Sequence, residues 1–187
     1  MTSYQASKPR ELSVGFRHQC EEIATLQRHE LGCYAFAPLT AQQLAQKLQV
    51  YIYPVDKLPG ADPAIVAYAL AQPDWSAAII QQSPAVVMHK PIHSPARQQS
   101  DLMHELAHIL LQHPWGSLES TTGRFLFSAI HEAEATHLGG CLLLPKRALE
   151  WALLKQFTIE QAMSHFGVSR EMVIWRSQIN HICLCSH

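Results

Sequence analysis

The segment from 101 to 113, Asp-Leu-Met-His-Glu-Leu-Ala-His-Ile-Leu-Leu-Gln-His, constrains this chain more than any other. An α-helix has about 3.6 residues per turn, so His104 and His108 would share one face and could bind one Zn²⁺. Glu105 follows the first histidine, where its carboxylate could act as general base on a water at the metal. This His-Glu-x-x-His pattern is typical of helices in zinc proteases.

The flanking residues predict that this segment is a helix. Ser94 suits an N-cap, Pro95 suits the first helical position, and Pro114 would end the run. Apolar residues recur at helical spacing and would bury one face. The alternative is a core helix that carries two histidines by chance, in a chain with 12 histidines. A buried Glu105 without a metal would be costly, so the residues favour a metal site.

Length and composition predict one domain, with at most a small appendage. The chain has 187 residues, of which 48% are hydrophobic and 16% charged, as in an ordinary globular core. A formal net charge of -1 indicates neither a nucleic-acid surface nor a membrane surface. The N-terminus lacks the apolar core of a signal peptide, and the five cysteines are irregularly spaced. We therefore expect a cytoplasmic protein with reduced thiols and no membrane association.

The pattern of apolar residues, caps and turn residues predicts an α+β fold. We expect a small, mostly antiparallel sheet beside the helix of the His-Glu-x-x-His motif. The expected strands are 50–53, 75–80 and 85–88, and the expected helices are 14–31, 41–48, 64–71, 95–113, 128–144, 146–154, 158–166 and 169–179.

The same pattern divides the chain into a core and a helical C-terminal part. We expect a flexible tail over 1–13, a core over 14–145, a helix-turn-helix-like subdomain over 146–180 and a second tail over 181–187. The segment 114–127 is loop-like and long enough to edge a cleft.

The C-terminal tail offers a second possible metal site. Potential ligands alternate at His181, Cys183, Cys185 and His187, which would place them on one side of an extended chain. The alternative is a disordered terminus without a site. The tail lacks Cys-x-x-Cys spacing and is the chain terminus, so the sequence favours a terminus without a site.

A zinc site of the expected kind needs a third protein ligand, with the fourth position left to water. The helix 128–144 carries Glu132 and Glu134, which are about 200° apart around a helix and cannot both face one metal. Glu132 shares its face with small residues, so it is the better candidate. The histidines His113, His131 and His137 remain rivals.

Two adjacent glycines in the same helix indicate close helix packing. Gly139 and Gly140 each cost about 1 kcal/mol inside a helix relative to alanine. The approach of another helix would explain them, and the helix 95–113 is the expected neighbour.

The motifs together resemble the ImmA/IrrE family of bacterial metallopeptidases. The resemblance rests on the His-Glu-x-x-His motif, on Glu132-x-Glu134-Ala135, and on the Leu-Leu-Leu-Pro run that ends at Pro145. It spans about 15–180 and implies a zincin-like metallopeptidase domain with one Zn²⁺ per chain. By this resemblance His104, His108 and Glu132 bind the zinc, and Glu105 is the base.

Some positions depart from the family pattern. Thr136 stands where the pattern has asparagine, Gly139 stands where it has alanine, and His137 precedes a leucine where phenylalanine is usual. These departures leave the ligands intact but change residues around them. Imidazole N–H groups need acceptors, for which Thr136 is a candidate, and a developing oxyanion needs a donor besides the metal. His113, His131, His137 or a tyrosine could be that donor.

The resemblance also implies a function. Family members resemble proteases that cleave a DNA-binding repressor, often of the helix-turn-helix class, and so derepress mobile-element or stress genes. The expected partner is therefore a protein substrate.

Two alternatives remain, a DNA-binding regulator and a toxin-antitoxin-like module that binds its partner with a non-catalytic zinc site. Direct DNA binding is not expected, because the helix 169–179 has only Arg170 and Arg176 as basic residues, with Glu171 between them. The presence of Glu105 favours catalysis over a binding module.

Overall fold

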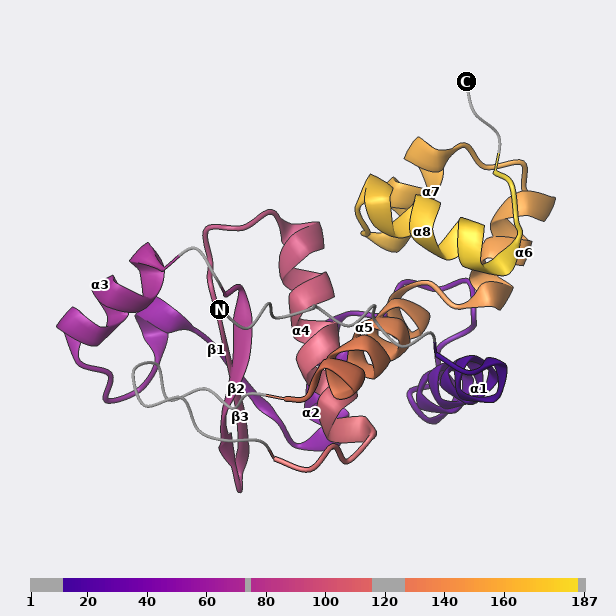
Figure 1. The fold of residues 1–187 in the computed structure, drawn as a ribbon. Coiled ribbons are helices and arrows are strands. Elements are labelled where there is room, and N and C mark those ends of the chain that lie inside the picture. The colour runs from indigo at the N-terminus through magenta and orange to yellow at the C-terminus, as the bar shows by residue number, and fades with distance from the viewer. Residues whose placement is uncertain (1–11, 73–74, 116–126, 185–187) are drawn as a thin grey trace, which may run out of the picture.

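The structure is a computed structural model that describes residues 12–72, 75–115 and 127–184 (Figure 1). Its elements confirm the predicted α+β class. In chain order they are α1 (Val14–Glu30), α2 (Ala41–Leu48), β1 (Tyr51–Pro54), the 3₁₀ helix η1 (Val55–Lys57), α3 (Pro63–Ala71), β2 (Ala77–Gln82), β3 (Ala85–His89), α4 (Pro95–Leu110), α5 (Ala129–Leu143), α6 (Lys146–Leu154), α7 (Ile159–Phe166) and α8 (Arg170–Asn180).

The three strands form one mixed sheet in the order β1-β3-β2. β2 and β3 are joined by a short turn and therefore pair antiparallel, whereas β1 pairs with β3 in parallel. The sheet thus contains one antiparallel and one parallel pair of strands, whereas a mostly antiparallel sheet was expected. The reason is that η1, α3 and β2 lie between β1 and β3 in sequence, so β1 joins the free edge of β3 through a crossover.

Side-chain caps begin most of the helices. Capping boxes begin two helices: the Thr40 and Thr158 hydroxyls accept from the backbone N–H of the third residue of α2 and α7, and glutamine side chains return the contact. Serine or aspartate side chains cap five further helices, at Ser13, Asp62, Ser94, Ser128 and Ser169. Ser13 belongs to the predicted N-terminal tail, of which residues 1–11 lie outside the described part of the chain.

α4 and α5 pack against each other beside the sheet and form the centre of the core (Figure 1). Leu102 and Leu106 of α4 and Leu138 and Leu142 of α5 are fully buried. A Cβ at Gly139 would lie 3.2 Å from the backbone nitrogen of His104, which confirms the predicted close approach of the two helices.

Gly140 serves a different contact from Gly139. A Cβ at Gly140 would clash with the indole ring of Trp175 in α8. The two glycines therefore admit two neighbours, α4 on one side of α5 and α8 on another.

Two buried arginines bind the C-terminal end of α5. Arg28 of α1 donates to the carbonyl oxygens of Leu142 and Leu143 at 2.9 and 3.2 Å, and Arg176 of α8 donates to that of Leu144 at 2.9 Å. Cations at this end satisfy carbonyls that the helix leaves unpaired. These bonds join the N-terminal helix and the C-terminal helices to α5.

No helix within the described ranges combines the length and the apolar character that a membrane-spanning helix needs.

Candidate metal centre and active site

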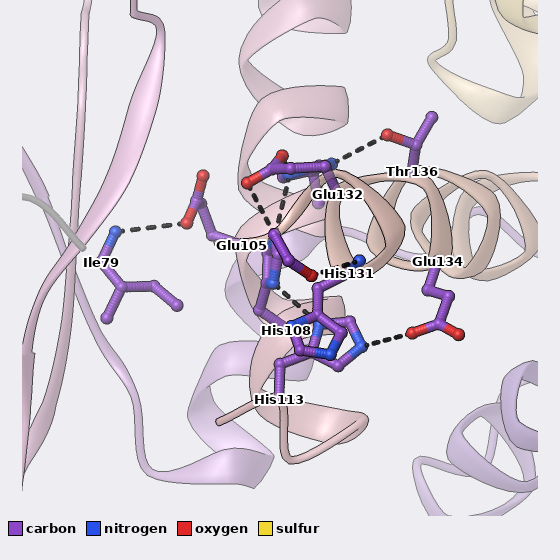
Figure 2. Close-up of polar contacts among 10 residues, drawn as sticks. Ile79, Glu105, His108, His113, His131, Glu132, Glu134 and Thr136 are labelled. Carbon is purple, nitrogen blue, oxygen red and sulfur yellow. Dashed lines mark hydrogen bonds and ion pairs between the residues drawn. The ribbon is translucent and has the colours of Figure 1, made fainter. Parts of the chain in front are cut away.

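Three potential metal ligands converge where α4 crosses α5 (Figure 2). His104 and His108 come from successive turns of α4, and Glu132 comes from the first turn of α5. The two Nε2 atoms are 3.1 Å apart. The Glu132 carboxylate lies 3.0 Å from Nε2 of His104 and 3.7 Å from Nε2 of His108. Among the described residues this is the one group of three or more such side chains that could hold a metal ion.

The spacing of these atoms fits a tetrahedral Zn²⁺ site. Zinc–nitrogen and zinc–oxygen bonds of about 2.0–2.1 Å place neighbouring ligand atoms roughly 3.3 Å apart around a tetrahedron. The three measured distances, from 3.0 to 3.7 Å, bracket that value. Two imidazoles and one carboxylate are also the donor set that catalytic zinc sites use. The residues present therefore fit the ion that the sequence predicts.

Glu132 is held in its ionised form by its surroundings. Hydrogen bonds with His104 and then with His108 lower the pKa of the Glu132 carboxyl far below its ordinary value, against the opposing effect of burial. Its place in the first turn of α5 also puts its charge near the positive end of the helix dipole. A ligand that is already ionised needs no deprotonation when a cation binds.

The two histidines differ in their protonation. Burial lowers the pKa of His104, but its hydrogen bond with Glu132 and the nearby carboxylates outweigh that effect and raise it overall. Burial lowers the pKa of His108, and the proximity of His104 lowers it further. The pKa values of the two histidines are therefore shifted in opposite directions, upward for His104 and downward for His108.

Glu105 lies beside this cluster but contacts the sheet. Its Oε2 accepts the backbone N–H of Ile79 in β2 at 3.2 Å (Figure 2). Burial raises the pKa of the Glu105 carboxyl to about 7, although His104 opposes the shift. A carboxylate with a pKa near neutrality is well matched to general-base chemistry.

A cleft of about 510 Å³ gives access to these groups. One wall is the segment from Trp75 to Ala78, which leads into β2, and the rest of the lining comes from α4 and α5 together with Phe127 and Met172 of α8. His104, Glu105 and Glu132 all line it, so the cluster and the carboxylate beside it share one cavity.

The second nitrogen of each histidine meets a different partner. Nδ1 of His104 lies 3.3 Å from the Thr136 hydroxyl, the acceptor considered from the sequence. Nδ1 of His108 lies 2.9 Å from Nδ1 of His113, whose Nε2 lies 3.1 Å from a carboxylate oxygen of Glu134 (Figure 2). His113 is thus placed behind a ligand and not among the ligands.

The other two histidines considered from the sequence, His131 and His137, contact residues other than the three metal ligands. His131 stacks on His113, with ring centroids 4.4 Å apart. His137 is buried on another side of α5, where its ring meets Trp175 edge-on at 6.1 Å. None of His113, His131 and His137 is among the residues that line the cleft, and a role for any of them as oxyanion donor remains a prediction.

Three groups that contact the ligands or the residues around them were not identified from the sequence. The Ile79 N–H is a backbone group that carries no signal of its own. Phe127, whose ring stacks on His108 at 3.7 Å between centroids, follows a segment that has no regular pattern. Glu134 is part of the recognised Glu-x-Glu motif, but the helical geometry only showed that it cannot share the metal with Glu132.

The described residues also include the predicted C-terminal subdomain and part of the C-terminal tail and of the loop 114–127. In α8, Arg176 is buried against Glu21, and Arg170 pairs with Glu160 of α7. His181 ends α8 and Cys183 is exposed, whereas Cys185 and His187 lie outside the described residues, as does most of the predicted loop 114–127. The second metal site and the role of that loop remain predictions.

The small sheet, the two crossing helices and the His-His-Glu cluster define a zincin-like domain of the metallopeptidase type. A family model described as the IrrE N-terminal-like domain, from a family of peptidases, matches residues 66–177. The chain belongs to this family, which confirms the resemblance found in its motifs. The matched region holds β2, β3, α4 and α5, and so all the residues of the cluster.

Comparison with solved structures gives a likeness in fold. A structure titled Mycobacterium tuberculosis transcriptional regulator matches with a TM-score of 0.55 and 16% sequence identity. The match covers 85% of this chain but 46% of the other, so this chain spans less than half the length of that regulator. At this identity the likeness concerns the fold alone. No curated protein matches the chain.

Proposed function

We propose that this protein is a zinc-dependent endopeptidase that hydrolyses a peptide bond in a DNA-binding transcriptional repressor and thereby derepresses mobile-element or stress-response genes. The observation that carries the proposal is that the ligand atoms of His104, His108 and Glu132 converge at a cleft that His104, Glu132 and the Glu105 carboxylate line together. A binding module would need the three ligands but has no use for a half-buried carboxylate beside them.

The residues divide the chemistry between them. A bound Zn²⁺ would polarise the scissile carbonyl and lower the pKa of a water molecule. Glu105 accepts the proton of the attacking water at its carboxylate and then delivers it to the amine that leaves. The hydrogen bond from Ile79 holds that carboxylate at the wall of the cleft. Thr136 holds the His104 ring so that its Nε2 faces the ligand cluster.

An extended peptide suits the cleft because one wall leads into an edge strand. β2 has β3 as its neighbour on one side, and within the described sheet its other edge is unpaired. An unpaired edge can add a further strand through main-chain hydrogen bonds, which recognises a peptide with little regard to sequence. This arrangement supports a protein substrate over a small amide.

The surface of α8 argues against direct binding of DNA. Its two arginines are engaged within the protein, Arg176 with Glu21 and Arg170 with Glu160. A helix that reads DNA normally presents free basic side chains to the phosphates and bases. The free cysteines among the described residues fit an activity in the reducing cytoplasm, where repressors are found.

The proposal is tested by comparing the wild-type protein with Glu105→Gln in bacterial cells. New protein N-termini are labelled and identified by mass spectrometry after each protein is expressed. We expect cleaved peptides from a DNA-binding repressor with the wild type and none with the variant, which keeps all three metal ligands.

Two outcomes would overturn the proposal. Identical sets of N-termini from both proteins would exclude a protease that uses Glu105. An intact repressor that co-purifies equally with both proteins would establish a partner-binding module instead.

A further inference from the structure

A chain of three side chains extends from the metal cluster toward the far end of α4. It runs from His108 through His113 to Glu134, with contacts of 2.9 Å between the two Nδ1 atoms and 3.1 Å from Nε2 of His113 to the carboxylate. His108 and His113 are both buried, at 2% and 7% exposure. No water can therefore replace either partner easily, and each contact has to be satisfied within the chain.

The end of α4 brings His113 back onto His108. Gln112 adopts a left-handed conformation with φ 52°, and the His113 N–H then bonds to the His108 carbonyl at 3.1 Å. The Gln112 N–H bonds to the Ile109 carbonyl at 3.1 Å, which completes a Schellman motif. His108 and His113 are thus joined twice, once through their backbones and once through their side chains.

The two Nδ1 atoms define the direction of the hydrogen bonds. At 2.9 Å one of them must donate and the other must accept. A carboxylate at Glu134 can only accept a hydrogen bond, so the N–H at Nε2 of His113 donates to it. A neutral His113 then has a lone pair on Nδ1 and accepts the N–H at Nδ1 of His108. That leaves a lone pair on Nε2 of His108, the atom that faces His104 and Glu132.

We propose that His113 and Glu134 are positioning residues that fix His108 in the tautomer able to bind the metal. The inference rests on the proposed metal-dependent function and adds a second role for α5. Glu132 supplies a ligand at the front of the cluster, and Glu134, two residues later, orients a ligand from behind (Figure 2). The opposite tautomer would place a proton on Nε2 of His108 and block coordination.

Two neighbouring rings keep the chain in place. Phe127 stacks on His108 with centroids 3.7 Å apart, and His131 stacks on His113 with centroids 4.4 Å apart. Both rings exclude water from the faces of the imidazoles without offering a competing hydrogen bond in the plane. The direction of the chain is therefore determined by Glu134.

The test is the zinc dissociation constant, measured at one pH by competition with a chromophoric chelator. His113→Phe keeps the ring volume and removes the acceptor, and we expect zinc binding to weaken by about 10–100-fold. His113→Asn restores an acceptor near the Nδ1 position and should recover part of the loss. Glu134→Ala should weaken binding, and the double variant with His113→Phe should be no weaker than His113→Phe alone, because the residues act as one unit.

A matched control separates this role from packing. His137→Phe makes the same change at a buried histidine that contacts Trp175 and lies outside the cleft. It should leave the zinc dissociation constant within about twofold of wild type. Thermal unfolding of the metal-free proteins checks that each variant folds. In the zinc-loaded wild type, imidazole ¹⁵N chemical shifts should show a protonated Nε2 and an unprotonated Nδ1 at His113.

The outcomes separate the inference from the proposed function. If the wild type binds zinc and His113→Phe binds it equally well, the inference fails and the proposed function stands. A protonated Nδ1 on His113 in the zinc-loaded protein would also overturn the inference. If the wild type binds no zinc, both fail. If zinc binds as expected but no repressor is cleaved, only the proposed function fails.

Discussion

Gly139 lies so close to α4 that a Cβ there would sit 3.2 Å from the backbone nitrogen of His104 and 3.3 Å from its Cα. The contact is with the backbone of a helix, which cannot move aside as a flexible side chain can. The two helices can therefore approach this closely, and bring His104 near Glu132, only because Gly139 has no side chain.

Gly139→Ala should separate α4 from α5 and lower the free energy of unfolding. Overpacking typically costs 1–3 kcal/mol, and the better helix propensity of alanine offsets about 1 kcal/mol of that. Zinc binding should weaken as well, because His104 moves relative to Glu132. Gly15→Ala is the control, since a Cβ there would meet nothing within 4 Å. An equally stable Gly139→Ala protein with unchanged zinc affinity would contradict the predicted contact.

Glu132→Gln should remove most of the affinity for zinc while the fold persists. The amide keeps the shape of the side chain but loses the charge that the carboxylate brings to the ion. Unfolding followed with and without zinc checks this. At zinc concentrations 100 times the dissociation constant, the ion should stabilise the wild type by about 2.7 kcal/mol and the variant by almost nothing. Glu150→Gln, at an exposed position of α6, should behave as wild type.

The metal-free protein should lose stability as the pH falls from about 6.5 toward 4. Burial, and then the nearby Arg176, lower the pKa of His137 from 6.5 to about 4. Between these values the unfolded chain binds the proton and the folded chain does not, so acid favours unfolding. We expect a loss on the order of 1–3 kcal/mol, measured by urea unfolding in the presence of a chelator.

His137→Phe should flatten this pH dependence, because it removes the titrating ring. Part of the slope should persist, since burial also lowers the pKa of His113 to about 4. An unchanged slope in His137→Phe would show that His137 does not stay neutral in the folded protein.

Gln112→Gly should stabilise the protein by up to about 1 kcal/mol. Gln112 has a left-handed backbone with φ 52°, where a side chain is strained and glycine is not. Its own side chain is exposed, so little packing is lost. The midpoint of thermal unfolding measures the gain. A lower midpoint would mean that the glutamine side chain makes a contact that outweighs the strain.

The regular parts of the fold could be predicted because their signals are local. The capping boxes at Thr40 and Thr158 and the serines before α4, α5 and α8 are read directly from short segments. The parallel pairing of β1 with β3 could not, because it depends on the path of the chain through α3. The boundary of α4 was also placed too late, since Pro114 is visible in the sequence but the left-handed turn at Gln112 is not.

In the candidate site, too, the features with a local sequence signal could be predicted and those that depend on distant elements could not. The spacing of His104 and His108 and the face of α5 that carries Glu132 follow from helical geometry, which sequence alone supplies. The partners of the ligands depend on where separate elements cross. Neither the contact of Glu134 with His113 nor the N–H that Ile79 donates to Glu105 has a local signal.

The hydrogen bond from Ile79 to Glu105 also fixes the position of the Glu105 carboxylate along β2. It fastens the proposed base to the same strand whose open edge would hold a peptide. A peptide paired with that edge advances about 3.3 Å per residue, so each possible register offers a different carbonyl to the base. The choice of scissile bond then becomes a matter of where along β2 the substrate stops, and the side chains that stop it need not lie near the metal at all.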